Sequence, residues 1–255
     1  MKKIITSIVL LFTVTLFAQD QLICVSGSAK SGEGILKNTE ETIFKAGIFN
    51  NEKLNGAGYK KEKNGNFYFS NFKNDLPTGF SVYFIGEGVK QHGVFKNGLK
   101  EGVHVLMFSD LTKYDLITYQ KDKEISRKNI TVSLDKLKDG CQGDCENGFG
   151  FKADGPEILL LGFFKNNAFI RGEIINIPNN SSEFYDFENK EEEKGMYISS
   201  DTENGFIEEY IVIDYFESKN INKQKSSTTV RKETNSFIVV SFDEQGNLKN
   251  KINNF

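Results

Sequence analysis

The chain of 255 residues contains no Trp, three Pro, three Cys and two His. Two imidazoles leave little material for histidine-based catalysis or for a zinc site, and three cysteines are too few for a disulfide-dense scaffold. The formal net charge of −3 excludes a strongly basic nucleic-acid binder, so we expect no nucleic-acid partner. Hydrophobic residues make up 38% of the chain, which is too many for a disordered protein and fits one or two globular domains.

The first eighteen residues have the layout of a secretory signal peptide. A basic start is followed by an uncharged apolar run that ends at Ala18, with polar residues after it. The run is shorter than the ~20 residues of a membrane span. A retained N-terminal anchor and lipidation at Cys24 are alternatives, although Ile23 is large for the residue before a lipidated cysteine. Cleavage would leave 30 basic and 35 acidic residues, a net charge of −5. We therefore expect a protein exported across the inner membrane, either periplasmic, in the cell envelope or secreted.

An oxidising compartment permits disulfides. Cys141 and Cys145 are four residues apart, and we expect them to pair across a sharp turn. A bridge from Cys24 to either of them, or three free thiols, are the alternatives.

A repeat of 23 residues runs through the first half of the chain. Phe49, Phe72 and Phe95 are spaced at this interval, each with Asn two residues later and Gly seven residues later. The pattern restarts at Phe164 and Phe187, where the glycine follows one residue further on. Residues 26–34 and 142–150 also match at an offset of 116, which indicates two copies of one array. The residues that mark the repeat are Gly47, Phe49, Gly56, Phe72, Gly79, Gly93, Phe95, Gly102, Gly162, Phe164, Gly172, Phe187 and Gly195.

Short segments rich in Phe, Val, Ile and Tyr, bounded by turn residues, surround these positions and predict strands. A unit of 23 residues fits two strands and two turns, which is one hairpin. The glycine two residues before each Phe leaves room for a ring from a neighbouring strand, and the later glycine allows a positive φ. The predicted fold is all-β: an elongated, open antiparallel sheet of successive hairpins, in two consecutive arrays with a C-terminal capping hairpin.

The units resemble the MORN repeat family (membrane occupation and recognition nexus). The resemblance lies in Gly-Ile-Phe-Asn-Asn (47–51), Gly-Val-Phe-Lys-Asn-Gly (93–98) and Gly-Phe-Phe-Lys-Asn (162–166), and in the opening segment 141–150. It implies a single-layer sheet of hairpins and suggests a membrane-surface ligand. The repeats are degenerate, because Phe replaces the usual Trp and Gly58 alone keeps the family's second glycine, whose place is taken elsewhere by residues such as Ser81 and His104.

The predicted organisation has six parts. They are a signal peptide (1–18), a first MORN-like array (19–125), a connector (126–139), a second MORN-like array (140–217), a flexible polar loop (218–236) and a C-terminal β-hairpin (237–255). A basic patch for an acidic partner is the alternative interpretation of the polar loop.

The sequence shows no nucleophile with a nearby base, no nucleotide-binding loop and no metal-ligand spacing, so we expect no catalytic residue, no cofactor and no metal. The leading hypothesis is a non-enzymatic repeat protein whose sheet surface binds another protein in the cell envelope. The alternatives are a phospholipid-binding module at the membrane surface and an enzyme that uses carboxylates on an envelope polymer. An open sheet has two faces to cover, and we predict that Phe67, Phe69, His92 and Val94 contact the partner.

Overall fold

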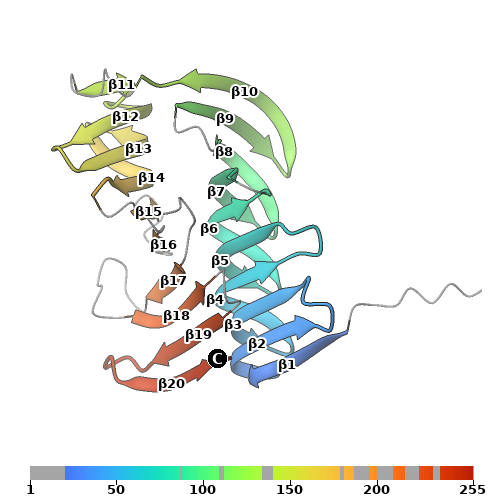
Figure 1. The fold of residues 1–255 in the computed structure, drawn as a ribbon. Coiled ribbons are helices and arrows are strands. Elements are labelled where there is room, and N and C mark those ends of the chain that lie inside the picture. Colours follow the sequence, from blue (N-terminus) through green and yellow to red (C-terminus); the bar gives the residue numbers. More distant parts are fainter. Residues whose placement is uncertain are drawn as a thin grey trace, which may run out of the picture.

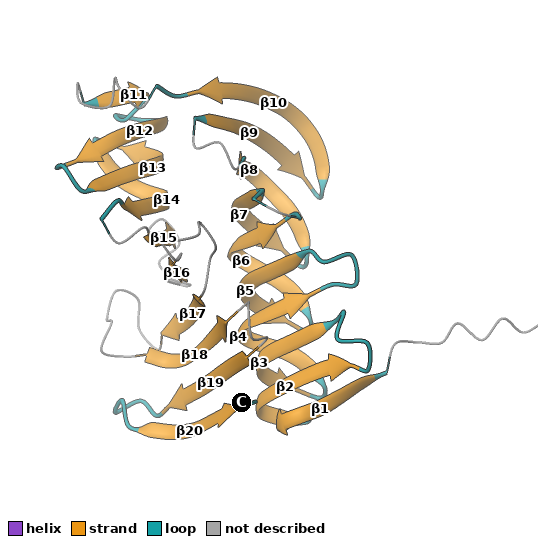
Figure 2. Ribbon diagram, viewed as in Figure 1, coloured by secondary structure: helices purple, strands orange, loops and turns teal. Residues whose placement is uncertain are grey.

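The computed structural model describes residues 21–86, 88–108, 112–133, 140–178, 181–186, 196–199, 209–215, 224–231 and 236–254. They form β-strands in two ten-stranded antiparallel sheets, without a helix (Figures 1 and 2). The predicted all-β class and the succession of hairpins are confirmed. None of the described segments is a helix of a length and hydropathy suited to crossing a bilayer. The predicted signal peptide, Phe187 and Gly195 lie outside the described residues.

Strand order within each sheet follows the chain, so each sheet is a meander. The strands of the first sheet are β1 (Leu22–Gly27), β2 (Ser31–Asn38), β3 (Phe44–Asn50), β4 (Lys53–Lys61), β5 (Phe67–Lys73), β6 (Leu76–Phe84), β7 (Lys90–Lys96), β8 (Leu99–Met107), β9 (Lys113–Gln120) and β10 (Lys123–Thr131). Those of the second sheet are β11 (Cys141–Gly143), β12 (Phe149–Asp154), β13 (Ile158–Lys165), β14 (Ala168–Asn176), β15 (Ser181–Asp186), β16 (Met196–Ser199), β17 (Glu209–Tyr215), β18 (Gln224–Arg231), β19 (Ser236–Phe242) and β20 (Leu248–Asn253).

The two sheets pack face to face and run in opposite directions along the molecule (Figure 1). Strand β2 packs against β19 and β20, β4 against β17 and β18, and β6 against β15, so the second sheet folds back along the first. The first strand of the first sheet, β1, and the last strand of the second sheet, β20, are therefore neighbours. The resemblance implied a single layer, but here each array covers one face of the other. The reason is that a sheet with an apolar face must bury it.

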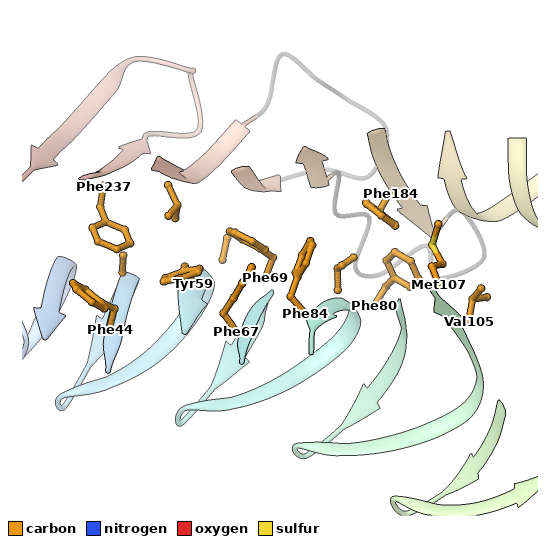
Figure 3. Packing of buried hydrophobic residues seen from close by; sticks show 14 of the residues in the cluster. Phe44, Tyr59, Phe67, Phe69, Phe80, Phe84, Val105, Met107, Phe184 and Phe237 are labelled. Carbon is orange, nitrogen blue, oxygen red and sulfur yellow. The ribbon is translucent and has the colours of Figure 1, made fainter. Parts of the chain in front are cut away.

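One hydrophobic core fills the space between the sheets (Figure 3). In the first sheet, one cross-strand row faces inward from β2 to β8, and each member is the register partner of the next. The members of this row are Ile35, Ala46, Tyr59, Phe69, Val82, His92 and Val105, all of them buried. Buried residues of the opposite sheet, including Phe151, Leu161, Phe184 and Phe237, complete the core.

The repeat asparagines occupy two-residue hairpin turns. Asn51, Asn74, Asn97 and Asn166 each come first in a turn, with φ between 49° and 53°, and the residue after each also has positive φ. Two positive φ values are what a type I′ turn requires, and this turn matches the twist of the paired strands. Asn tolerates this left-handed conformation better than most residues because its short side chain can bond to the local backbone.

The fourth unit has Lys121 in the first turn position, with φ of 50°. We expect Lys121→Asn to raise the free energy of unfolding by about 0.5–1 kcal/mol, because Lys gains nothing in the left-handed region. Urea unfolding measures the change, and Asn97→Lys in an equivalent turn should lower stability by a similar amount. A destabilised Lys121→Asn variant would contradict this explanation of the repeat.

Glycines form a matching row on the outward face of each sheet. In the first sheet the row is Gly27, Gly34, Gly47 and Gly58, and in the second it is Gly143, Gly150, Gly162 and Gly172. The rows support the interpretation of two copies of one array. The rows also correct the prediction that Gly172 is the counterpart of Gly56. Gly172 pairs with Gly162 in the same way that Gly58 pairs with Gly47, so Gly172 is the counterpart of Gly58.

Close packing explains why the rows need glycine. A Cβ on Gly34 would lie 2.8 Å from the Phe49 ring, and one on Gly172 would lie 2.2 Å from the Leu161 carbonyl oxygen. The predicted role of the glycine before the repeat Phe is confirmed at Gly93, where an added Cβ would meet the His104 ring at 2.4 Å. Gly56, Gly79 and Gly102 have positive φ, as predicted.

Two predicted boundaries need correction. Residues 126–131 of the predicted connector belong to strand β10, which completes the first sheet. Residues 224–231 of the predicted flexible loop form strand β18, and the described side chains Ser226 and Thr228 are buried. Thr228 Oγ1 donates a hydrogen bond of 3.4 Å to the Ala57 carbonyl oxygen of the opposite sheet, so hydroxyl groups rather than large apolar groups fill this part of the core. The closing hairpin, β19 and β20, forms as predicted.

The disulfide joins Cys141 to Cys145, with a Cα–Cα distance of 6.1 Å, which is the pairing that we expected. The bridge joins β11 to the turn that leads into β12, at the start of the second sheet. Cys24 is a free and exposed thiol on β1.

Candidate functional site

The residues predicted to contact a partner do not form an exposed surface. Phe67, Phe69 and His92 face the second sheet and are 8%, 0% and 2% exposed, so this prediction is wrong for them. The second sheet covers the face on which they lie. Val94 is half-buried, and its carbonyl oxygen lies 2.9 Å from His104 Nε2. The face of the first sheet that is turned away from the core is thus the one left for a partner.

A register row crosses this outward face from β1 to β10. Strands lie about 4.8 Å apart, so nine steps make a row about 43 Å long. Because side chains alternate between the two faces of a sheet, this row lies on the face opposite to that of the inward core row. Its members, each the cross-strand partner of the next, are Cys24, Leu36, Lys45, Lys60, Tyr68, Tyr83, Gln91, Leu106, Asp115 and Asn129.

Tyrosine rings and lysine side chains stack in the middle of this face. Lys60, Tyr68 and Tyr83 belong to the register row, and Lys100 and Tyr119 lie beside it. The Tyr68 and Tyr83 rings stack with their centroids 4.2 Å apart and their planes 19° apart. Lys60 Nζ lies 6.0 Å from the Tyr68 centroid. Lys100 Nζ lies 5.5 Å from the Tyr83 centroid and 4.9 Å from that of Tyr119. We call Lys60, Tyr68, Tyr83, Lys100 and Tyr119 the tyrosine–lysine row.

Amide side chains hold the tyrosine–lysine row in place. Asn66 Nδ2 donates a hydrogen bond of 2.6 Å to the Tyr83 hydroxyl, and Gln91 Nε2 donates one of 3.2 Å to the Tyr119 hydroxyl. Lys100 Nζ donates in turn to Gln91 Oε1 at 2.7 Å. Gln91 is 1% exposed, so its amide is a buried link between Lys100 and Tyr119. These contacts restrict the side chains before any partner arrives, which lowers the entropy lost on binding.

Burial sets the electrostatics of the row. It lowers the pKa of the Lys100 ammonium, while Asp122 and Glu124 act in the opposite direction. The contacts with two ring faces replace part of the hydration that Lys100 loses. Burial also raises the pKa of the Tyr68 phenol well above its ordinary value, and the charge of Glu62 adds to the rise. The Tyr68 hydroxyl therefore keeps its proton even under alkaline conditions.

His104 supports the row from the same face. Its ring makes edge contacts with Phe95 and Tyr119, each at 5.2 Å between centroids, and its Nε2 lies 2.9 Å from the Val94 carbonyl oxygen. Burial lowers the pKa of His104 to about 4, although the contact with Val94 opposes this shift. The imidazole is thus a neutral, fully covered spacer.

Acid should destabilise the protein through His104. Between pH 6.5 and about 4 the unfolded chain binds a proton that the folded chain does not, so stability falls as the pH falls through this window. Urea unfolding should show a loss from pH 7 to pH 5 that is about 2 kcal/mol larger in the wild type than in His104→Gln. His92, whose pKa burial also lowers, and the carboxylates remain in both proteins and cancel from the comparison. Equal losses in the two proteins would contradict the assignment.

The described part of the chain also has a pocket on the second sheet, of about 380 Å³. Arg171 lies over the Phe163 ring, with 4.6 Å from the guanidinium carbon to the ring centroid. The lining residues are Asn147, Gly148, Phe163, Phe164, Lys165, Ile170 and Arg171, which include none of the facing carboxylates that the enzyme alternative requires. Within the described ranges, no three His, Cys, Asp or Glu side chains come together in a way that could hold a metal ion.

Sequence analysis missed the tyrosine–lysine row. Its members are 8 to 19 residues apart in the chain, and they meet only when each hairpin has its observed register. The type I′ turns could have fixed part of that register, because the turn residues follow from the Asn positions. The bulges after Gly47, Phe69 and His92 shift the register further and have no clear signal in the sequence.

No protein-family model matches the chain, and no curated protein matches it. The resemblance to MORN repeats therefore depends on the repeat residues alone and stays a prediction.

Proposed function

We propose that this chain is a non-enzymatic, exported protein that binds another protein through the outward face of its first sheet. The observation that supports the proposal is the tyrosine–lysine row, a prearranged set of aromatic rings and ammonium groups contributed by five strands between β4 and β9. The side chains of the three tyrosines are half-buried, and the hydroxyl groups of Tyr83 and Tyr119 accept hydrogen bonds that hold their rings in place.

Tyrosine is suited to this role on physical grounds. It contributes a large amphipathic area at a low cost in conformational entropy, and it is among the residues that dominate binding energy in protein interfaces. The second sheet gives the first a rigid support, because its side chains pack against the inward face of β2 to β8. A rigid surface of this kind is suited to binding a partner. It is less suited to an enzyme whose active site must close over its substrate.

The test compares two tyrosines on opposite sides of the molecule. Immobilised protein captures partners from an envelope extract at low and high salt, and mass spectrometry identifies a stoichiometric partner. Tyr83→Ser should weaken that partner's binding by about 30-fold or more, the effect of one interface hot spot of about 2 kcal/mol. Tyr185→Ser, a half-buried tyrosine on β15 of the second sheet, should leave it unchanged.

Circular dichroism melts of both variants show whether the fold is kept. Capture that is lost in Tyr185→Ser and kept in Tyr83→Ser would contradict the proposal. Salt-sensitive binding to anionic phospholipid vesicles, without any captured protein, would favour the membrane-surface alternative.

A further inference from the structure

The four edge strands of the two sheets differ in how they are protected. Among the described strands, the edges are β1, β10, β11 and β20, each of which is hydrogen-bonded to one other described strand. An edge strand presents unpaired backbone groups, and proteins commonly shield such strands with charged side chains. Strand β10 carries four charged residues and β20 carries two lysines. Strand β11 is three residues long and is closed by the disulfide.

Strand β1 has the sequence Leu-Ile-Cys-Val-Ser-Gly and no charge at all. Ile23 is 44% exposed and Val25 is 37% exposed, so two large apolar side chains lie together on one uncharged edge. Repeat proteins need polar outer faces on their terminal units to remain soluble. The β10 end of the first sheet meets this requirement and the β1 end does not.

We infer that β1 is a homodimer interface, on which β1 of a second copy pairs in antiparallel orientation about a two-fold axis. Such a pairing supplies each edge with the backbone groups it lacks. Centred on Cys24, it places Ile23 of each copy opposite Val25 of the other, and apolar β-branched pairs of this kind stabilise adjacent strands.

The other pairings that the edges allow are less favourable. Strand β10 carries three cations (Lys123, Arg127 and Lys128) and one anion (Glu124), so pairing two β10 strands gathers an excess of positive charge, which is unfavourable. Pairing of β1 with β10 of another copy is head-to-tail and generates open filaments, whereas the two-fold pairing closes. The bulge at Val25 shortens the regular part of β1, so the interface is small and the dimer weak.

The first test measures mass against concentration. Light scattering of the purified protein under reducing conditions, over roughly 1–300 µM, should show an increase towards twice the monomer mass. Ile23→Lys should remain monomeric over the whole range. Ile125→Lys, at a 54% exposed isoleucine on edge strand β10, should dimerise like the wild type. Both positions are exposed, and melting curves confirm that each variant folds.

The second test uses Cys24 as a distance reporter. The proposed register places the two Cys24 residues opposite each other, with Cα atoms about 4.5–5.5 Å apart, within the range of a disulfide. Diamide, an azo oxidant, takes up two electrons and two protons as the two thiols form one S–S bond. The covalent dimer should form at least about 10-fold faster than in a Cys24→Ser/Ile125→Cys control. The reason is that two thiols already held close together react faster than thiols that must first collide.

Any of three results would overturn the inference. The first is a monomer mass at every concentration. The second is equal cross-linking rates in the wild type and the Ile125→Cys control, which would show random collision of exposed thiols. Loss of the dimer in Ile125→Lys but not in Ile23→Lys would assign the contact to β10 and also contradict it.

Discussion

Phe69→Ala is expected to lower the free energy of unfolding by about 3–5 kcal/mol, the cost of removing a large buried ring from a packed core. Phe69 is fully buried in the middle of the inward row, 5.2 Å between ring centroids from Tyr59 and 6.1 Å from Phe84 (Figure 3). The second sheet lies directly over it, so its neighbours belong to both arrays. A cavity at this position weakens the contact that holds the arrays together.

Urea unfolding with the wild type as reference measures the loss. Phe69→Leu, which keeps most of the volume, should cost less than the alanine variant. Ile125→Ala, at an exposed position, should stay within about 0.5 kcal/mol of the wild type. If Phe69→Ala kept full stability and lost only partner binding, the inward face would be a binding surface and the two-layer packing would be wrong.

The hairpins could be predicted because their signals are local. Asn51 and Asn97 start type I′ turns. Gly47 lies close to the backbone of the next strand, and Gly93 lies close to the His104 ring. These roles follow from residue types at fixed spacing. The offset of about 116 residues between arrays also corresponds to a structural fact, the two matching glycine rows.

The packing of one array on the other could not be predicted in the same way. Alternation along a strand says which residues share a face, but it does not say what covers that face. Phe69 and Tyr68 are both aromatic, and only the position of the second sheet makes one core and the other surface. Strand β18 shows the same limit, because its buried Ser226 and Thr228 are of residue types usually found at the surface.

The buried ion pair between the sheets provides the second large effect. Lys90 Nζ of β7 lies 2.5 Å from Glu173 Oε1 of β14, and the Glu173 side chain is fully buried. Lys90 Nζ also lies 5.1 Å from the Phe184 ring centroid. The two residues are 83 positions apart, so nothing in the sequence connects them. We expect Lys90→Met to lower the free energy of unfolding by about 3–5 kcal/mol, because it leaves a buried carboxylate without its cation.

The double variant Lys90→Met/Glu173→Leu should recover most or all of this loss, since two apolar side chains of similar volume remove both the attraction and the cost of burying the charges. The double-mutant cycle, measured by urea unfolding, thus separates pairing from packing. Additive losses in the two single variants and the double variant would contradict a direct coupling. Recovery would show that the charges do little for stability. Their value would then lie in register, because an ion pair in an apolar core holds β7 opposite β14 and penalises every other alignment of the two arrays.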